Sequence, residues 1–148
     1  MSKKKIIFIS ILLGVFLMCI GAYIGVDIYN HTPKRLYERN WKITLPKKMN
    51  QEFDISTEPS FHGDGVRFSA FSSKSEISNE FLTGFKTEDI ECFKEEIYKY
   101  LEMLKVPNEY YPNFEHPCRM KKMEMYSNKL YLIYDEKTYN LYVVQWLQ

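Results

Sequence analysis

The pattern of apolar and polar residues divides the chain into one long uncharged segment and a longer stretch of short, alternating segments. Residues 6–26 contain no charged side chain over 21 positions. A helix that rises about 1.5 Å per residue needs about 20 apolar residues to cross the hydrocarbon core of a bilayer. Residues 6–26 are therefore predicted to form a transmembrane helix that holds the chain in the lipid bilayer.

The charges that flank this segment predict its orientation. Lysines occupy positions 3–5 immediately before it, and Asp27 follows it. Cytoplasmic flanks carry an excess of lysine and arginine, so residues 1–5 are expected inside and the C-terminal part outside a single-pass cell-membrane anchor. Lys34, Arg35 and Arg39 oppose this bias, but the three lysines lie closer to the segment.

Two rival interpretations of residues 6–26 are cleaved targeting signals. A signal peptide has an apolar core of about 7–15 residues and a small-x-small cleavage site, and this segment is longer and lacks a clear site. A lipoprotein signal needs a small residue before the lipidated cysteine, whereas Met18 precedes Cys19. Gly21 and Gly25 form a GxxxG pair, which favours a homodimer where helices approach closely, although glycine is also common in such helices.

Residues 27–40 are expected to form a juxtamembrane stalk, with a short helix over 33–39 because Pro33 suits the first turn of a helix. Residues 41–148 then form one extracytoplasmic domain of ordinary size. Alternating apolar and polar positions predict six strands in this domain. They lie at 41–45, 51–56, 66–70, 119–125, 129–134 and 141–147, with a hairpin from Phe53 to Phe71 and a tight turn at Ser127–Asn128.

The clearest helical pattern runs from Thr87 to Lys105. Apolar residues recur there at spacings of three and four, which is typical of one buried helix face. Glu95, Glu96, Lys99 and Glu102 are assigned mainly to the solvated side. Residues 76–85 suggest a second, short helix that ends at Gly84. The predicted fold class is α+β: a transmembrane helix followed by a two-layer domain in which an antiparallel sheet packs against one long helix.

The charge distribution argues against nucleic-acid binding. Without the three N-terminal lysines, 17 basic residues face 19 acidic residues, a formal net charge of −2. Proteins that bind nucleic acid usually carry a clustered basic face. We therefore expect no nucleic-acid partner, and we also expect no cofactor.

The segment Phe61–Gly65, FHGDG, is the most unusual in the chain. Two glycines around Asp64 favour a tight turn, so a structural hairpin loop is the leading interpretation. His62 and Asp64 could instead form a partner-binding loop, or a metal or catalytic site, although no nucleophile or third ligand lies nearby. Together with the following VRFSAF, this segment resembles small membrane-anchored or secreted proteins of low-GC Gram-positive bacteria. That resemblance implies a compartment and no activity.

A second candidate binding surface is the aromatic loop before the last strands, where Tyr110, Tyr111 and Phe114 alternate with prolines. Tyrosines favour interfaces, but packing of these rings on the domain is the stronger expectation. His116 with Cys118 and Glu115 is a weaker candidate site, because no zinc-site spacing and no CxxC motif is present.

Cys92 and Cys118 could pair outside the cytoplasm, and free thiols are the default expectation. No catalytic or metal-binding constellation emerges from the sequence, so the expected function is a membrane-anchored extracytoplasmic interaction or accessory domain. The alternative is a small envelope hydrolase or metal-dependent enzyme that uses the loop of His62 and Asp64.

Overall fold

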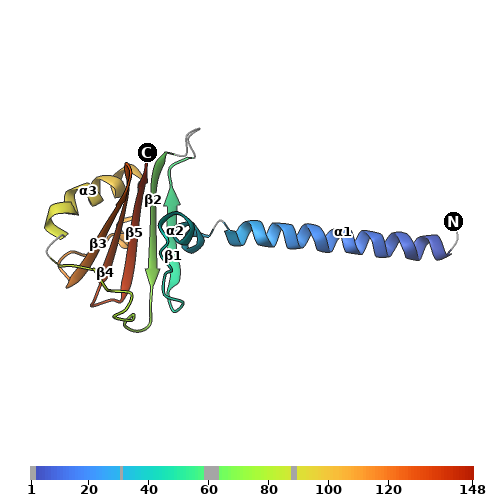
Figure 1. Ribbon diagram of the computed structural model, residues 1–148, viewed down its shortest axis with the longest axis horizontal. Coiled ribbons are helices and arrows are strands. Elements are labelled where there is room, and N and C mark those ends of the chain that lie inside the picture. Colours follow the sequence, from blue (N-terminus) through green and yellow to red (C-terminus); the bar gives the residue numbers. More distant parts are fainter. Residues whose placement is uncertain (1–2, 31, 59–63, 88–89) are drawn as a thin grey trace. The chain divides into compact units, whose positions relative to one another are not determined.

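The computed structural model describes residues 3–30, 32–58, 64–87 and 90–148. The chain divides after Thr44 into two units, and Figure 1 shows the elements of each. The first unit holds two helices, α1 (Lys3–Asn30) and α2 (Pro33–Trp41). The second holds strands β1 (Asn50–Ser56) and β2 (Gly65–Ser72), helix α3 (Ile90–Met103), the 3₁₀ turn η1 (Asn108–Tyr110), and strands β3 (Cys118–Met125), β4 (Asn128–Asp135) and β5 (Asn140–Leu147).

Helix α1 is long and apolar enough to cross a membrane. Its span Ser10–Tyr29 covers 20 residues with a mean hydropathy of 2.3, and none of it is buried. Helix α2 begins at Pro33, which supplies no backbone N–H and suits a first helical turn. The short helix expected after the membrane segment therefore exists, and residues 27–30 continue α1.

The strand predicted at 41–45 is wrong, because Trp41 is the last residue of α2. Pro33, Tyr37 and Trp41 are spaced four residues apart and are all buried, so the helical period includes the tryptophan. Lys42 follows in the left-handed conformation, with φ of 58°, and its N–H donates to the carbonyl of Glu38 at 3.0 Å. This C-terminal cap ends the helix, and no strand forms at residues 42–46.

The five described strands form one antiparallel sheet in the order β1-β2-β5-β4-β3, so the predicted hairpin from Phe53 to Phe71 is confirmed. The hairpin is irregular opposite Phe71, where the register shifts between Gln51 and Phe53 of β1 and leaves Glu52 as an extra residue. Strand β2 itself continues regularly to Ser72.

Helix α3 packs against one face of this sheet and confirms the predicted amphipathic stripe. Ile97 and Leu101 are fully buried, and Phe93 packs at the edge of the same core. The sheet contributes alternate residues to this core, including Phe68, Tyr131 and Val144. The α+β architecture with one sheet and one long helix is therefore as expected from the sequence (Figure 1).

Residues 76–85 do not form the short helix that their apolar spacing suggested. Successive turns replace it, with hydrogen bonds from Phe81 N to Ser78 O and from Phe85 N to Leu82 O, both 3.0 Å. The backbone N–H of Ile77 donates to the Tyr134 hydroxyl at 3.4 Å, which ties this segment to the sheet face opposite α3. At the start of this segment, the backbone therefore bonds to a distant side chain where helical hydrogen bonds were expected.

The turn between β3 and β4 lies one residue earlier than expected. Met125 pairs with Asn128, so Tyr126 and Ser127 form the connection and Asn128 already belongs to β4. Tyr126 takes the left-handed conformation with φ of 57°, and its side chain is 99% exposed.

Candidate functional site

A small cavity of about 150 Å³ lies at one end of strands β1, β2 and β5. It opens beside the predicted hairpin loop, of which the structure describes Asp64 and Gly65. Its walls combine polar and apolar side chains. The lining residues are Ser56, Thr57, Asp64, Gly65, Val66, Arg67, Gln145 and Leu147.

The backbone at the cavity is held by reciprocal hydrogen bonds between the two strands of the hairpin. Thr57 N donates to Val66 O at 2.9 Å, and Val66 N donates to the Thr57 hydroxyl at 3.1 Å. Gly65 is required between them, because a Cβ atom there would lie 2.2 Å from Thr57 Oγ1. The glycine of the FHGDG segment at position 65 therefore leaves the space that the Thr57 hydroxyl occupies.

Two charged residues, Asp64 and Arg67, line the cavity, and Arg67 is fixed by Asp54. Arg67 Nε and Nη2 donate to the two carboxylate oxygens of Asp54 at 2.9 and 2.5 Å, and the Ser69 hydroxyl donates to the same carboxylate at 2.5 Å. Gln145 pairs with Arg67 across β2 and β5. Its side chain is buried, and its Oε1 atom has no hydrogen-bond partner within the described part of the chain. Such a wall suits a small polar group that can donate hydrogen bonds.

The two candidate residues of the hairpin loop are only partly placed. His62 lies outside the described residues, so its relation to Asp64 is not part of the structure. Asp64 is exposed at the start of β2 and lines the cavity. Among the described residues, no group of three or more His, Cys, Asp or Glu side chains could hold a metal ion.

The aromatic loop packs on the domain. Tyr110 stacks on Phe53 of β1 with ring centroids 4.4 Å apart, and Tyr111 stacks on Tyr98 of α3 at 5.9 Å. Phe114 meets the same Tyr98 edge-on at 5.5 Å. The three rings are half-buried, and together they join β1, α3 and the loop into one aromatic layer.

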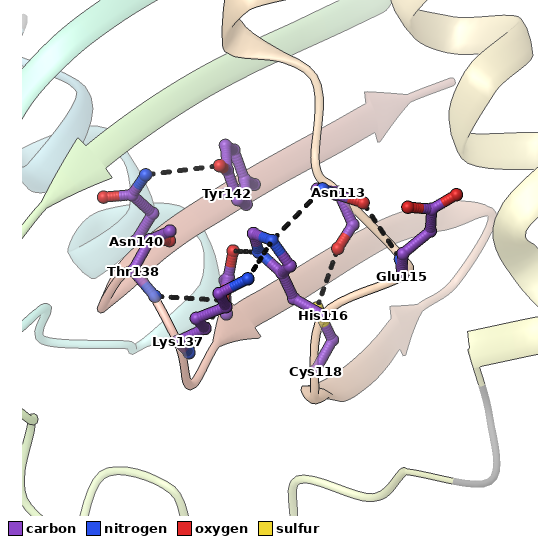
Figure 2. A network of polar contacts seen from close by, with 9 residues as sticks. Asn113, Glu115, His116, Cys118, Lys137, Thr138, Asn140 and Tyr142 are labelled. Carbon is purple, nitrogen blue, oxygen red and sulfur yellow. Dashed lines mark hydrogen bonds and ion pairs between the residues drawn. The ribbon is translucent and has the colours of Figure 1, made fainter.

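His116 belongs to a polar network that the sequence pattern does not reveal (Figure 2). Its Nδ1 lies 2.7 Å from Asp135 Oδ2, while Asn113 Nδ2 and Lys137 Nζ approach its Nε2 at 3.2 and 3.3 Å. Asn113 Oδ1 accepts from Glu115 N, which leaves its amino group to face the histidine. Because the Lys137 amine and the Asn113 amino group can only donate, Nε2 accepts and Nδ1–H donates to Asp135 Oδ2. The ring is thus fully used in structural hydrogen bonds.

Asp135 anchors this network at the end of β4. It is 1% exposed, and its Oδ1 accepts from the backbone N–H groups of Lys137 and Thr138 at 2.8 and 3.1 Å. Burial alone raises the pKa of this carboxyl, but the hydrogen bonds from His116 and the turn outweigh burial and hold the pKa below its ordinary value. The sequence signal for this Asx turn is the aspartate itself, at the start of the polar segment DEKTYN between two predicted strands.

Cys118 is a poor nucleophile in this setting. Its thiol is buried and donates to the carbonyl of Asn113 at 3.6 Å (Figure 2), while His116 Nδ1 lies 2.7 Å from Asp135 Oδ2. Burial, followed by the charges of Asp135 and Glu136, raises the pKa of the thiol to about 11. Cys92 is exposed, and both cysteines are free. The His116–Cys118 pair therefore supports the position of the loop, with no arrangement for catalysis.

The sequence pattern assigns Glu96 to the solvated side of its helix, and this assignment is wrong. Its carboxylate accepts hydrogen bonds from Lys129 Nζ at 2.7 Å, Tyr131 Oη at 2.6 Å and Tyr100 Oη at 2.9 Å. Burial raises the pKa of Glu96, yet these donors outweigh it and lower the pKa to about 2. Burial and the neighbouring carboxylate raise the pKa values of both tyrosines. The cluster joins α3 to β4 and has a structural function.

The described residues thus define a class of protein: an α+β domain, with a small polar cavity, that follows one helix suited to crossing a membrane. Comparison of the chain with protein-family models, with curated proteins and with solved structures finds no match.

Proposed function

We propose that the chain is a single-pass membrane protein whose α+β domain faces the outside and binds a partner at the cavity beside the hairpin loop. The observation that carries the anchor is that Ser10–Tyr29 is apolar and entirely unburied. A core helix of a soluble protein would be covered by other elements. The apolar run also exceeds the about 7–15 residues of a signal-peptide core.

The orientation rests on the lysines at positions 3–5. The cations after the helix precede a segment of more than 100 residues. Long domains cross the membrane largely regardless of their charge, so the short N-terminal flank determines orientation. The C-terminal domain is accordingly placed outside.

The cavity supports partner binding because charged Arg67 and buried Gln145 line it, and Gln145 Oε1 has no hydrogen-bond partner within the described residues. A partner that donates a hydrogen bond there would relieve the cost of leaving a buried acceptor unpaired. The described residues place no nucleophile with an activating base, so a binding function is preferred to hydrolysis.

The anchor and its orientation are tested in a Gram-positive host. The full chain should resist alkaline extraction from membranes, and its intact mass should include residues 6–26. Protease added to intact protoplasts should digest the domain. Soluble protein of reduced mass would identify a cleaved signal, and full protection from protease would reverse the orientation.

The binding site is tested by photocrosslinking in the same membranes. A photoreactive residue at exposed Glu58 or Asp64, next to the cavity, should give a discrete adduct. The same residue at exposed Lys99 on α3 is the control and should give none. The adduct should weaken with Gln145→Leu, which removes the unsatisfied oxygen at similar size. Equal labelling from all three positions would refute a specific site at the cavity.

A further inference from the structure

The segment that follows α1 has a positive net charge, whereas the remainder of the chain has a negative one. Residues 27–48 contain six basic and two acidic side chains, a net charge of +4. Residues 49–148 contain 11 basic and 17 acidic side chains, a net charge of −6. We call the six basic residues the basic collar: Lys34, Arg35, Arg39, Lys42, Lys47 and Lys48.

The length of α1 places the start of the basic collar at the membrane surface. The 28 residues of α1 extend over about 42 Å at 1.5 Å per residue. A bilayer measures about 40–45 Å with its headgroups and about 30 Å without them. The uncharged run ends at Val26, so Tyr29 at the end of α1 falls within the headgroup layer, where tyrosine is favoured.

Contacts within the first unit hold α2 at that same depth. The Arg35 guanidinium carbon lies 4.5 Å from the centre of the Tyr29 ring, and Arg35 Nη2 donates to the Tyr29 hydroxyl. The hydroxyl and the backbone N–H of Thr32 both donate to the carbonyl of Tyr29, at 2.9 and 3.3 Å. The first turn of α2 therefore folds back to the end of the membrane helix.

Most of the collar is available for a ligand. Arg35 is partly neutralised by Glu38 at 2.5 Å. Arg39, Lys42, Lys47 and Lys48 are exposed, and within the described part of the chain no ion pair with a carboxylate is seen for these four. All four cations follow Tyr29 within 19 residues of chain, and solvated cations of this kind are complementary to phosphate.

We propose that the basic collar binds the phosphates of anionic phospholipids in the membrane that α1 crosses. The proposal rests on α1 remaining attached as the anchor. Each lysine or arginine near an anionic bilayer strengthens binding about fivefold, which corresponds to about 1 kcal/mol. The net negative charge of residues 49–148 is repelled by the same lipids, so binding is confined to the collar.

The test is lipid binding to the intact full chain in a neutral detergent, measured by native mass spectrometry. Phosphatidylglycerol is the anionic probe and phosphatidylcholine is the zwitterionic control. The collar variant combines Arg39→Gln, Lys42→Gln, Lys47→Gln and Lys48→Gln. The matched control combines Lys74→Gln, Lys86→Gln, Lys99→Gln and Lys105→Gln, four exposed lysines of the domain.

The wild-type chain should bind phosphatidylglycerol more tightly than phosphatidylcholine, with an affinity that falls as salt is added. The collar variant should lose at least about fivefold in phosphatidylglycerol affinity, the contribution of one cation, and the matched control should keep the wild-type value. Equal affinity of the collar variant and the wild type would overturn the proposal, as would an affinity of the wild type that does not depend on salt. A failed anchor is recognised separately, by a mature mass that lacks α1.

Discussion

The carboxylate of Glu96 lies 2.6 Å from the phenolic oxygen of Tyr131, and this hydrogen bond joins helix α3 to strand β4. Lys129, also on β4, donates to the same carboxylate at 2.7 Å. One polar residue of α3 thus fixes the helix on the sheet beside the apolar contacts of Leu101. The position of the helix depends on both kinds of contact.

Removing the Glu96 carboxylate should destabilise the domain. Glu96→Ala leaves the hydroxyl of fully buried Tyr131 and the amine of Lys129 without their acceptor, at a cost of about 1–3 kcal/mol. Urea unfolding of the full chain in detergent, followed by tryptophan fluorescence, measures this. Glu95→Ala is the control, because the neighbouring Glu95 is exposed, and it should change the free energy of unfolding little.

The same carboxylate predicts a dependence of stability on pH. The pKa of Glu96 is about 2 in the folded state, against an ordinary value of 4.5. A lowered folded-state pKa stabilises the fold above pH 4.5, and this contribution is lost as the pH falls from 4.5 toward 2. The stability difference between the wild type and Glu96→Gln should therefore shrink over that range. A difference that stays constant there would contradict the assignment.

The apolar face of α3 predicts a larger effect. Leu101 is fully buried against the sheet, so Leu101→Ala should cost about 2–5 kcal/mol. Met103 is the matched control on the same helix, because it is 53% exposed, and Met103→Ala should be nearly silent. Similar small losses from both substitutions would mean that α3 does not pack as described.

The elements with long, regular periods were predictable from the sequence, and the failures occurred where the local pattern was short. Helix α3 and strands β3 to β5 follow from their apolar spacing. At 41–45 a five-residue alternation competed with the four-residue spacing that links Trp41 to Tyr37, and the helical spacing prevailed. At 76–85 only Ile77 and Leu82 are buried, and Ile77 N donates to the distant Tyr134 hydroxyl where a helix was predicted.

The candidate site was less predictable because its parts come from distant segments. The sequence of the hairpin loop identified Asp64 as a candidate. The cavity is also lined by Gln145, which is 81 positions later in the chain. In the sequence His116 groups with its neighbours Glu115 and Cys118, whereas its ring contacts Asp135 and Lys137. Sequence spacing identifies residues of one element, while a site between strands depends on their order in the sheet.

The two cysteines of the domain should differ sharply in reactivity. Cys92 is exposed, whereas Cys118 is buried and its thiol pKa is raised to about 11, so few Cys118 thiolates exist at neutral pH. A maleimide should therefore modify Cys92 in the folded chain and reach Cys118 only after denaturation. Peptide mass mapping assigns each adduct, and Cys92→Ser provides the control. A disulfide between the two cysteines would show as protection of both until reduction.

Gly65 should not tolerate a side chain, because Thr57 Oγ1 occupies the space that a Cβ atom would need. A Cβ there would lie 2.2 Å from Thr57 Oγ1, and that oxygen cannot move without losing its hydrogen bond from Val66 N. Gly65→Ala should therefore destabilise the domain by about 1–3 kcal/mol, as overpacking does elsewhere. Asp64→Asn, at the adjacent exposed position, is the control and should change the melting temperature little.

A double-mutant cycle separates this clash from a general intolerance of the loop. Thr57→Ala removes Oγ1 and leaves the Cβ of residue 57, which would lie 3.6 Å from a Cβ at residue 65, an ordinary van der Waals contact. Thr57→Ala alone should cost the hydrogen bond to Val66 N. In that background, however, Gly65→Ala should cost markedly less than in the wild type, because the two substitutions act on one contact. Strictly additive losses would show that Gly65 is needed for another reason, and the cavity wall would then not depend on the contact between Gly65 and Thr57.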